Sequence, residues 1–224
     1  MNADELTGQA RTHIATLADP DCMLHAQVVQ PFLNLRRAAK TQGFDLKPLS
    51  GFRDFARQLE IWNGKFSGAR PMYDVSGVQL DAAALTPFER VHAILLWSAL
   101  PGASRHHWGT ELDLIDGLAG ASGYRDKLTP QAFAPGGPFA PLAEWLEIHA
   151  PRFGFFRPYQ GRRSGVQPEP WHFSFAPIAE LARRALSPTV LRTAIAAAPL
   201  LGKELVLEHL DELHARYVAT IDLP

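Results

Sequence analysis

Two short segments far apart in the chain carry side chains of the types that hold a catalytic metal ion. The first, residues 104–113, reads SRHHWGTELD and contains His106 and Asp113. The second reads EPWH and contains Glu169 and His172. Catalytic zinc typically takes three protein ligands, drawn from His and Asp or Glu, and keeps a fourth position for water. The two segments therefore offer a complete ligand set with one carboxylate to spare.

The spacing within each segment suits this chemistry. Gly109 permits a tight turn, so a histidine from a loop and an aspartate from the following strand can face one centre. The rigid Glu-Pro step before His172 gives the Glu169 carboxylate a fixed direction near the metal without making it a fourth ligand. Zinc lowers the pKa of its bound water to about 7 and polarises a carbonyl. Glu169 can take the proton of that water and pass it to a leaving amine.

A third segment precedes these two and completes a pattern. It contains Ser50-Gly51-Phe52-Arg53, followed by Gln58. In chain order the three segments read S-G-F-R-x-x-x-x-Q, S-x-H-x-x-G-x-x-x-D and E-x-W-H. This order resembles the VanY-type D-alanyl-D-alanine carboxypeptidases, within the wider lysostaphin/carboxypeptidase/hedgehog metal-binding fold. The resemblance covers roughly residues 25–176.

The resemblance implies a role for each matching residue. Glu169 would be the catalytic acid and base, and Arg53 would lie near the substrate and pair with a carboxylate or a developing oxyanion. That role suits guanidinium, which presents a fork of donors to carboxylate oxygens. Gln58 and Ser104 match positions that line the substrate site. One Zn²⁺ per chain and a peptidoglycan-derived peptide substrate from the cell wall are implied as well. The implied metal ligands are His106, Asp113 and His172.

Some positions leave alternatives open. Many relatives have a small residue, often alanine, where this chain has Glu111. Strand alternation puts Glu111 on the same side as Asp113, either behind the metal ligands or in the substrate pocket. His107 is an alternative ligand, but adjacent side chains diverge, so we favour a supporting or surface role for it. For Arg53 the alternative is a structural salt bridge.

Several aromatic residues accompany the motifs. We expect Trp171 to pack in a way that positions the neighbouring histidine, since aromatic side chains supply buried area and rigidity. Trp108 is either a pocket wall or core. Tyr124 and Tyr159 lie in candidate cleft loops and could donate hydrogen bonds to a substrate.

Composition excludes several classes of function. The 224 residues are 46% hydrophobic and 20% charged, as in a soluble globular protein. A formal net charge of −1 gives no electrostatic case for binding nucleic acid or an anionic membrane. No apolar run is long enough to span a membrane. No secretory signal is visible, which favours a cytoplasmic location unless a leader has been removed and the site is periplasmic. The single cysteine, Cys22, is expected to be a small buried hydrophobe in a helix.

The pattern of elements is α+β, with a small antiparallel sheet that carries the zinc site, flanking helices and a helical C-terminal extension. We expect residues 1–176 to form the zinc peptidase domain with N-terminal helices, and 177–224 to form a helical extension packed on it. We expect three long loops to form walls of a substrate cleft. The loops are 67–85, 117–139 and 157–170. The expected helices are 3–18, 19–42, 55–62, 87–100 and 141–149, and the expected strands are 44–49, 111–116 and 171–175.

Three functions remain as hypotheses. The first is a metallo-carboxypeptidase that releases terminal D-alanine from peptidoglycan stem peptides. The second is an endopeptidase of the same fold, of the L-alanyl-D-glutamate type. The third is a zinc-stabilised binding module without turnover, which the presence of Glu169 disfavours because a structural metal site has no need of that carboxylate. Oligomeric state is not encoded in any pattern of the sequence.

Overall fold

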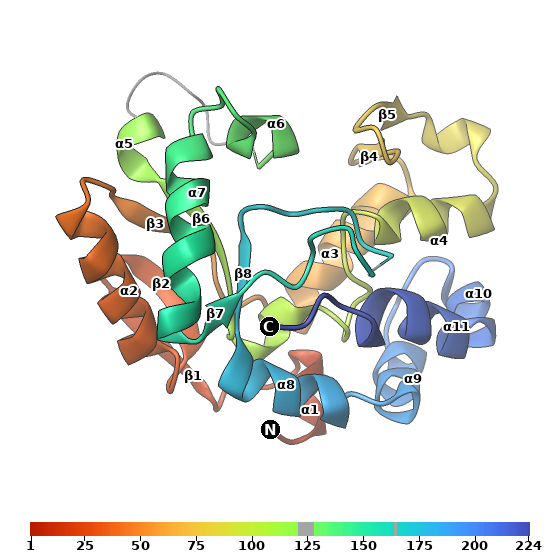
Figure 1. Ribbon diagram of the computed structural model, residues 1–224. Coiled ribbons are helices and arrows are strands. Elements are labelled where there is room, and N and C mark those ends of the chain that lie inside the picture. Colours follow the sequence, from red (N-terminus) through yellow and green to blue (C-terminus); the bar gives the residue numbers. More distant parts are fainter. Residues whose placement is uncertain (121–127, 164) are drawn as a thin grey trace.

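The computed structural model describes residues 1–120, 128–163 and 165–224. Its main sheet has four antiparallel strands in the order β3-β6-β8-β7, with helices packed around it (Figure 1). The expected α+β class and small antiparallel sheet are thereby confirmed. The strands are β1 Ile14–Ala18, β2 Asp21–His25, β3 Leu46–Ser50, β4 Met72–Tyr73, β5 Gln79–Leu80, β6 Glu111–Asp116, β7 Phe155–Phe156 and β8 His172–Phe175. The α-helices are α1 Ala3–Thr7, α2 Val29–Thr41, α3 Phe55–Phe66, α4 Pro87–Leu95, α5 Gly117–Gly120, α6 Pro130–Phe133, α7 Ala140–His149, α8 Ala176–Ala185, α9 Pro188–Ala197, α10 Lys203–Glu208 and α11 Leu210–His214.

Strand alternation separates an apolar face of the sheet from a polar one. Leu112 and Leu114 of β6 and Phe173 of β8 belong to one buried cluster. This cluster also contains residues of α2 and α7, which cover that face of the sheet (Figure 1). The intervening positions of β6, Glu111 and Asp113, point the other way, because successive side chains on a strand alternate between faces. The candidate site residues of the sheet therefore share one face.

The C-terminal helices share a hydrophobic core with α3 and α4. Trp62 of α3, Leu95 of α4 and Leu210 of α11 are buried in one cluster. Trp62 also donates from Nε1 to the carbonyl of Leu201 at 3.0 Å. Helix α4 begins with a capping box, in which Thr86 is the N-cap. The tail thus contributes to a core that α3 and α4 share.

The N-terminal segment differs from the expected pair of helices. Helix α1 ends at Thr7, and β1 and β2 form an antiparallel hairpin where helix had been expected. The half-buried Cys22 accordingly lies in a strand, not in a helix. The backbone of β2 bonds to distant loops: His25 N–H donates to Gly109 O at 2.8 Å, and Met23 O accepts from the Phe52 N–H at 2.7 Å. These long-range bonds, which local periodicity does not encode, favour strand over helix here.

Gly109 is required where the hairpin meets the site. Its φ of +66° is left-handed, and a Cβ built on it would lie 2.5 Å from His25 N. Only glycine combines that backbone angle with so close an approach. Within the described ranges, no helix has the length and apolar character needed to cross a membrane.

Candidate active site

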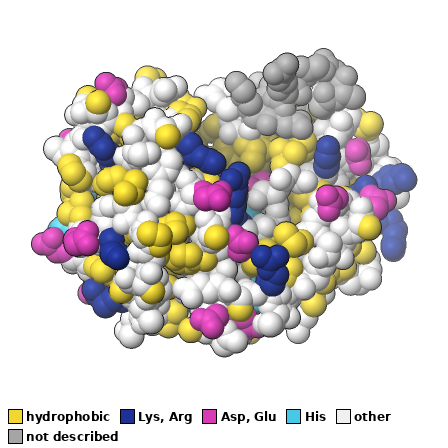
Figure 2. Space-filling view, turned by 180° about the vertical axis from the view of Figure 1, so that it is seen from behind, with side chains coloured by type: hydrophobic (Ala, Val, Ile, Leu, Met, Phe, Trp, Pro, Cys, Tyr) yellow, Lys and Arg dark blue, Asp and Glu magenta, His cyan; other side chains and the backbone are white. Residues whose placement is uncertain are grey.

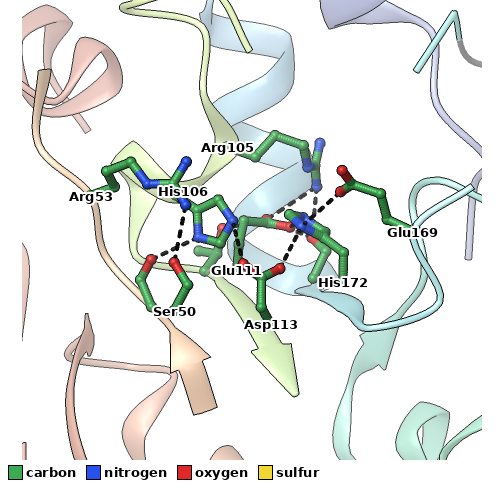
Figure 3. Close-up of polar contacts among 11 residues, drawn as sticks. Ser50, Arg53, Arg105, His106, Glu111, Asp113, Glu169 and His172 are labelled. Atoms are coloured by element: carbon green, nitrogen blue, oxygen red, sulfur yellow. Dashed lines mark hydrogen bonds and ion pairs between the residues drawn. The ribbon is translucent and has the colours of Figure 1, made fainter. Parts of the chain in front are cut away.

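Three buried side chains from different parts of the fold converge on one point (Figure 3). His106 lies in the 3₁₀ turn Arg105–Trp108, Asp113 in the central strand β6 and His172 at the start of β8. The register pairs Asp113 directly with His172. One ligand atom from each residue lies within 4.8 Å of those of the other two. The antiparallel pairing of β6 and β8 brings Asp113 and His172 together, and the 3₁₀ turn before β6 adds His106.

Hydrogen bonds leave one ring nitrogen of each histidine directed at Asp113. His106 Nδ1 lies 2.7 Å from Gly51 O, and because a carbonyl only accepts, this nitrogen donates. In the neutral ring His106 Nε2 then carries a lone pair, and it lies 3.4 Å from Asp113 Oδ2. In His172, Nδ1 lies 3.1 Å from Asp113 Oδ1. Burial lowers the pKa of His106 to about 4, so this imidazole is neutral at pH 7, as a metal ligand must be.

The donor set fits a zinc ion. Two imidazole nitrogens and a carboxylate oxygen form a three-ligand set of the kind that catalytic zinc sites use. Tetrahedral bonds of about 2.0–2.1 Å place donor atoms about 3.3 Å apart. The His106 and His172 nitrogens lie 3.4 and 3.1 Å from the two different oxygens of Asp113, and one donor atom of each residue lies within 4.8 Å of the others. Burial lowers the pKa of His172, but hydrogen bonds with Asp113 and Glu111 outweigh it and raise this pKa to about 10. The cluster thus favours positive charge at its centre.

Glu111 lies behind His172 and not in the substrate pocket. Its Oε2 is 2.8 Å from His172 Nε2. Its Oε1 accepts from the hydroxyls of Thr110 and Ser174 at 2.9 and 2.8 Å and lies 3.3 Å from a guanidinium nitrogen of Arg105. Burial raises the pKa of Glu111, but Arg105 and the bond with His172 outweigh it and lower it to about 2. A carboxylate in this place fixes the orientation of a ligating imidazole.

Glu169 stands on the other side of His172. Its Oε2 lies 3.4 Å from His172 Nδ1, and the side chain is 13% exposed. The backbone N–H of His172 donates to Glu169 O at 3.1 Å, which closes the Glu-Pro-Trp-His turn. Burial raises the pKa of Glu169 to about 7, although His172 opposes this shift. A carboxyl group that titrates near pH 7 can both take up and release a proton at neutral pH.

Arg53 is held by neutral partners at the edge of the site. Its guanidinium donates to Gln58 Oε1 at 2.9 Å and to Ser50 Oγ at 3.1 Å. Gln58 in turn donates to Ala99 O at 2.7 Å. Among the described residues no carboxylate lies within 4.0 Å of this guanidinium, so the alternative of a structural salt bridge is not observed. Ser104 is buried and lines the same cleft.

His107 is held by two hydrogen bonds away from the metal position. Its Nδ1 donates to Arg53 O at 2.6 Å, and its Nε2 accepts from the Gly102 N–H at 3.1 Å. Both ring nitrogens are therefore occupied, and the supporting role favoured over that of a ligand is the one observed. Trp108 is fully buried core. Trp171 packs against Phe133, with ring centroids 5.7 Å apart.

A cleft of about 370 Å³ opens in front of these residues. In the space-filling view, Lys and Arg side chains stand along one wall of a hollow in this face (Figure 2). Tyr159 lines the cleft, and its ring lies 5.1 Å from that of His172. Burial raises the pKa of Tyr159, so its hydroxyl remains a donor. Tyr124, the other tyrosine proposed from sequence, lies outside the described residues.

The sequence patterns did not predict three residues that line the cleft or support the site. Arg105 is adjacent to a ligand but belongs to no recognised motif position. Lys65 follows Gln58 by seven residues, two turns of one helix, and this spacing could have placed it on the cleft face of α3. Tyr217, from the C-terminal tail, also lines the cleft. No pattern in the tail connects it with the distant motifs.

Comparison with known proteins agrees with the architecture and the motif order. The family model for VanY, D-alanyl-D-alanine carboxypeptidase, matches residues 21–178. An uncharacterised protein of Haemophilus influenzae is 37% identical over 121 residues, which are 53% of this chain and 92% of that protein. A D-alanyl-D-alanine carboxypeptidase of Enterococcus faecalis is 29% identical over 157 residues, 67% of this chain and 47% of that protein.

Two solved structures have the same fold. VanYB in complex with D-Alanine-D-Alanine has a TM-score of 0.56 at 20% identity, and the match covers 85% of this chain and 92% of the other. A mutant of the D,D-pentapeptidase VanY in complex with Zn(II) has a TM-score of 0.53 at 22% identity, with 88% and 92% covered. The family match spans more than half of the chain and includes all three candidate ligands. The chain therefore belongs to the VanY family of D-alanyl-D-alanine carboxypeptidases.

Proposed function

We propose that this protein is a zinc-dependent carboxypeptidase that hydrolyses D-alanyl-D-alanine-type bonds in peptidoglycan stem peptides. The observation that carries the proposal is that Glu169 and Arg53 lie in one cleft with the buried ligand cluster, and that Arg53 forms no ion pair with any described residue. The ligands are proposed to be His106, Asp113 and His172. When bound there, zinc would supply a water of lowered pKa and polarise the scissile carbonyl.

The chain's own residues account for the remaining tasks. With its pKa raised to about 7 by burial, Glu169 can accept a proton from water and release it to the leaving amine. The Arg53 fork, held by Gln58 and Ser50, is proposed to pair with the C-terminal carboxylate of the peptide. Ser104 and Gln58 are proposed to line the substrate position. Tyr159 and Trp171 also line this cleft.

Incubation of the zinc-loaded protein with a muropeptide that ends in D-Ala-D-Ala tests the proposal. We expect release of free D-alanine, with little release by the Glu169→Ala variant. Absence of release by the wild type, or undiminished release by the variant, contradicts the proposal. Cleavage between L-alanine and D-glutamate would instead identify an endopeptidase.

A second measurement separates an enzyme from a binding module. Chelation of the metal is expected to abolish D-alanine release, and added zinc is expected to restore it. Loss of thermal stability on chelation without any turnover by the zinc-loaded protein would favour the module. His209, whose ring lies 5.0 Å from that of Phe88 outside the cleft, supplies a control, because His209→Ala is expected to retain zinc while His106→Ala loses it.

A further inference from the structure

The α3 wall of the cleft carries two cations that the metal centre does not use. Lys65 lies in the last turn of α3 and Arg70 follows the helix, and both line the cleft with Arg53. Gln58, Ile61 and Lys65 are spaced by three and four residues, so they project from one face of α3. That face begins beside Arg53, because Gln58 holds the Arg53 guanidinium.

Lys65 is fixed in place by a neutral partner. Its Nζ donates to Ser98 Oγ at 2.8 Å. The carbonyl of the next residue, Ala99, accepts from Gln58, so the ammonium is tied to the same short segment as the amide that holds Arg53. An ammonium group has three N–H donors. In the described part of the chain, no carboxylate lies within 4.0 Å of this nitrogen.

Arg70 is positioned by the absence of a side chain on α3. A Cβ built on Gly64 would lie 2.9 Å from Arg70 Cδ and 3.1 Å from its Nε, so the stem of Arg70 crosses the helix at the glycine. The Arg70 N–H also donates to Gly64 O at 2.8 Å. Glycine in a helix interior costs about 1 kcal/mol relative to alanine. Gly64 therefore lowers the stability of α3 but allows the Arg70 side chain to pack closely against the helix, one residue before Lys65.

Lys65 and Arg70 line one cleft, and within the described residues neither side chain forms an ion pair. Burial lowers the pKa of Lys65 to about 8; Glu169 opposes the shift, and Arg53 and Arg70 add to it. The carboxylates among the described lining residues, Asp113 and Glu169, both belong to the metal end of the cleft. A cleft wall of one charge sign attracts ligands of the opposite sign. A bound anion would relieve the repulsion between the two side chains.

We propose that Lys65 and Arg70 form a second carboxylate subsite, distinct from the position at Arg53. The preferred substrate would then be a peptide that carries a carboxylate in addition to its C-terminal one. The inference rests on the proposed peptidase function, since carboxylates are the anions that a peptide offers. It goes beyond that function by naming an acidic peptide as the substrate class and by assigning two residues outside the motifs.

Matched peptide pairs test the subsite. Each pair ends in D-Ala-D-Ala and differs by Glu against Gln at one position, which is one of the three residues that precede this end. Binding is measured by calorimetric titration of the zinc-loaded Glu169→Gln variant, so that no turnover is needed. At one position or more, we expect the Glu peptide to bind about tenfold more tightly than its Gln partner, as for a charge-assisted hydrogen bond.

Variants in the same background assign that preference. Lys65→Met keeps the apolar stem and is expected to reduce the affinity ratio of the Glu peptide over the Gln peptide to about twofold or less. The same reduction is expected for Arg70→Gln. Lys65→Arg is expected to retain most of the ratio. The control Lys47→Met, on the exposed position of β3, is expected to leave it unchanged. Equal binding of Glu and Gln peptides at all three positions overturns the proposal, as does a preference that survives both Lys65→Met and Arg70→Gln.

Cleavage of the same peptides by protein with native Glu169 separates the two proposals. Charge-dependent binding without cleavage of any peptide would refute the peptidase function and leave the subsite standing. Cleavage of both members of every pair at equal kcat/KM, together with equal binding, would refute the subsite and leave the peptidase function standing.

Discussion

Glu111 Oε2 and His172 Nε2 are joined by a 2.8 Å hydrogen bond beneath the ligand cluster. Because this bond occupies the outer nitrogen of the ring, Nδ1 is the nitrogen that faces Asp113. Glu111 is itself held by Arg105 and Ser174. This acidic residue therefore orients the His172 ring, which is a proposed metal ligand. Substrate contact, the other role considered for it, is not what the geometry supports.

Glu111→Ala is therefore expected to weaken zinc binding by about 10- to 100-fold, the usual cost of losing such a partner. Competition with a chromophoric chelator measures the affinity. Glu111→Gln keeps an oxygen that can accept from His172 Nε2, so a smaller loss is expected. Equal zinc affinity in wild type and Glu111→Ala would show that packing alone orients the ring.

Glu169→Gln is expected to separate metal binding from chemistry. The amide cannot take a proton, so kcat for D-alanine release should fall by about 10²- to 10⁴-fold. Zinc content, measured by atomic emission, should stay at that of the wild type, because Glu169 is not a proposed ligand. Glu208→Gln, at the end of α10, is the control. Loss of zinc in Glu169→Gln would instead place this carboxylate among the ligands.

Lys65→Met is expected to make the protein more stable at neutral pH. The pKa of Lys65 is lowered from 10.5 to about 8 in the folded protein. Burial of the charged Lys65 therefore lowers the free energy of unfolding by its full amount below pH 8, where the side chain is protonated in both the folded and the unfolded protein. This loss of stability fades between pH 8 and 10.5, where only the unfolded protein keeps the proton. We expect Tm of the variant to exceed that of the wild type by on the order of 2–4 °C at pH 7. Thermal scans at pH 7 and pH 10.5 check this, and a difference that grows with pH contradicts it.

Removal of residues 177–224 is expected to unfold the protein and not merely to alter its specificity. Leu191, Val206 and Leu210 of the tail are buried in the cluster that contains Trp62. Each such side chain contributes about 1.5–3 kcal/mol on full burial, which is large relative to a total stability of about 5–15 kcal/mol. Circular dichroism of the fragment 1–176 should show no cooperative transition. A cooperative transition would identify the tail as a separable extension.

Much of the candidate site could be predicted because metal chemistry restricts residue types and local spacing. His106, Gly109 and Asp113 form a turn and a strand within a few residues, and Glu169 precedes His172 by one proline-stiffened turn. Alternation in β6 indicated which side chains share a face. The assignment of Arg53 to a substrate carboxylate stays a prediction, as do the catalytic role of Glu169 and the ligand roles of the cluster.

The N-terminal hairpin, the orientation of Glu111 and the cationic wall of Lys65 and Arg70 could not be predicted in this way. Each depends on partners far away in the chain: Gly109 for β2, His172 for Glu111, and Ser98 for Lys65. Helical and strand periods report only which face of an element is apolar. They do not report which distant backbone or side chain that face will meet.

By itself, then, the sequence determined the family, the donor atoms available to a metal and the carboxylate beside them, because these follow from residue type and short-range order. Only the tertiary structure decided that Glu111 supports His172, that α3 and the segment after it contribute two further cations to the cleft, and that the C-terminal tail completes its wall. Those outcomes depend on contacts between residues 33 to 139 positions apart, from the bond of Lys65 with Ser98 to the bond of Trp62 with Leu201. Such contacts arise from the free energy of the whole fold, which no local pattern contains.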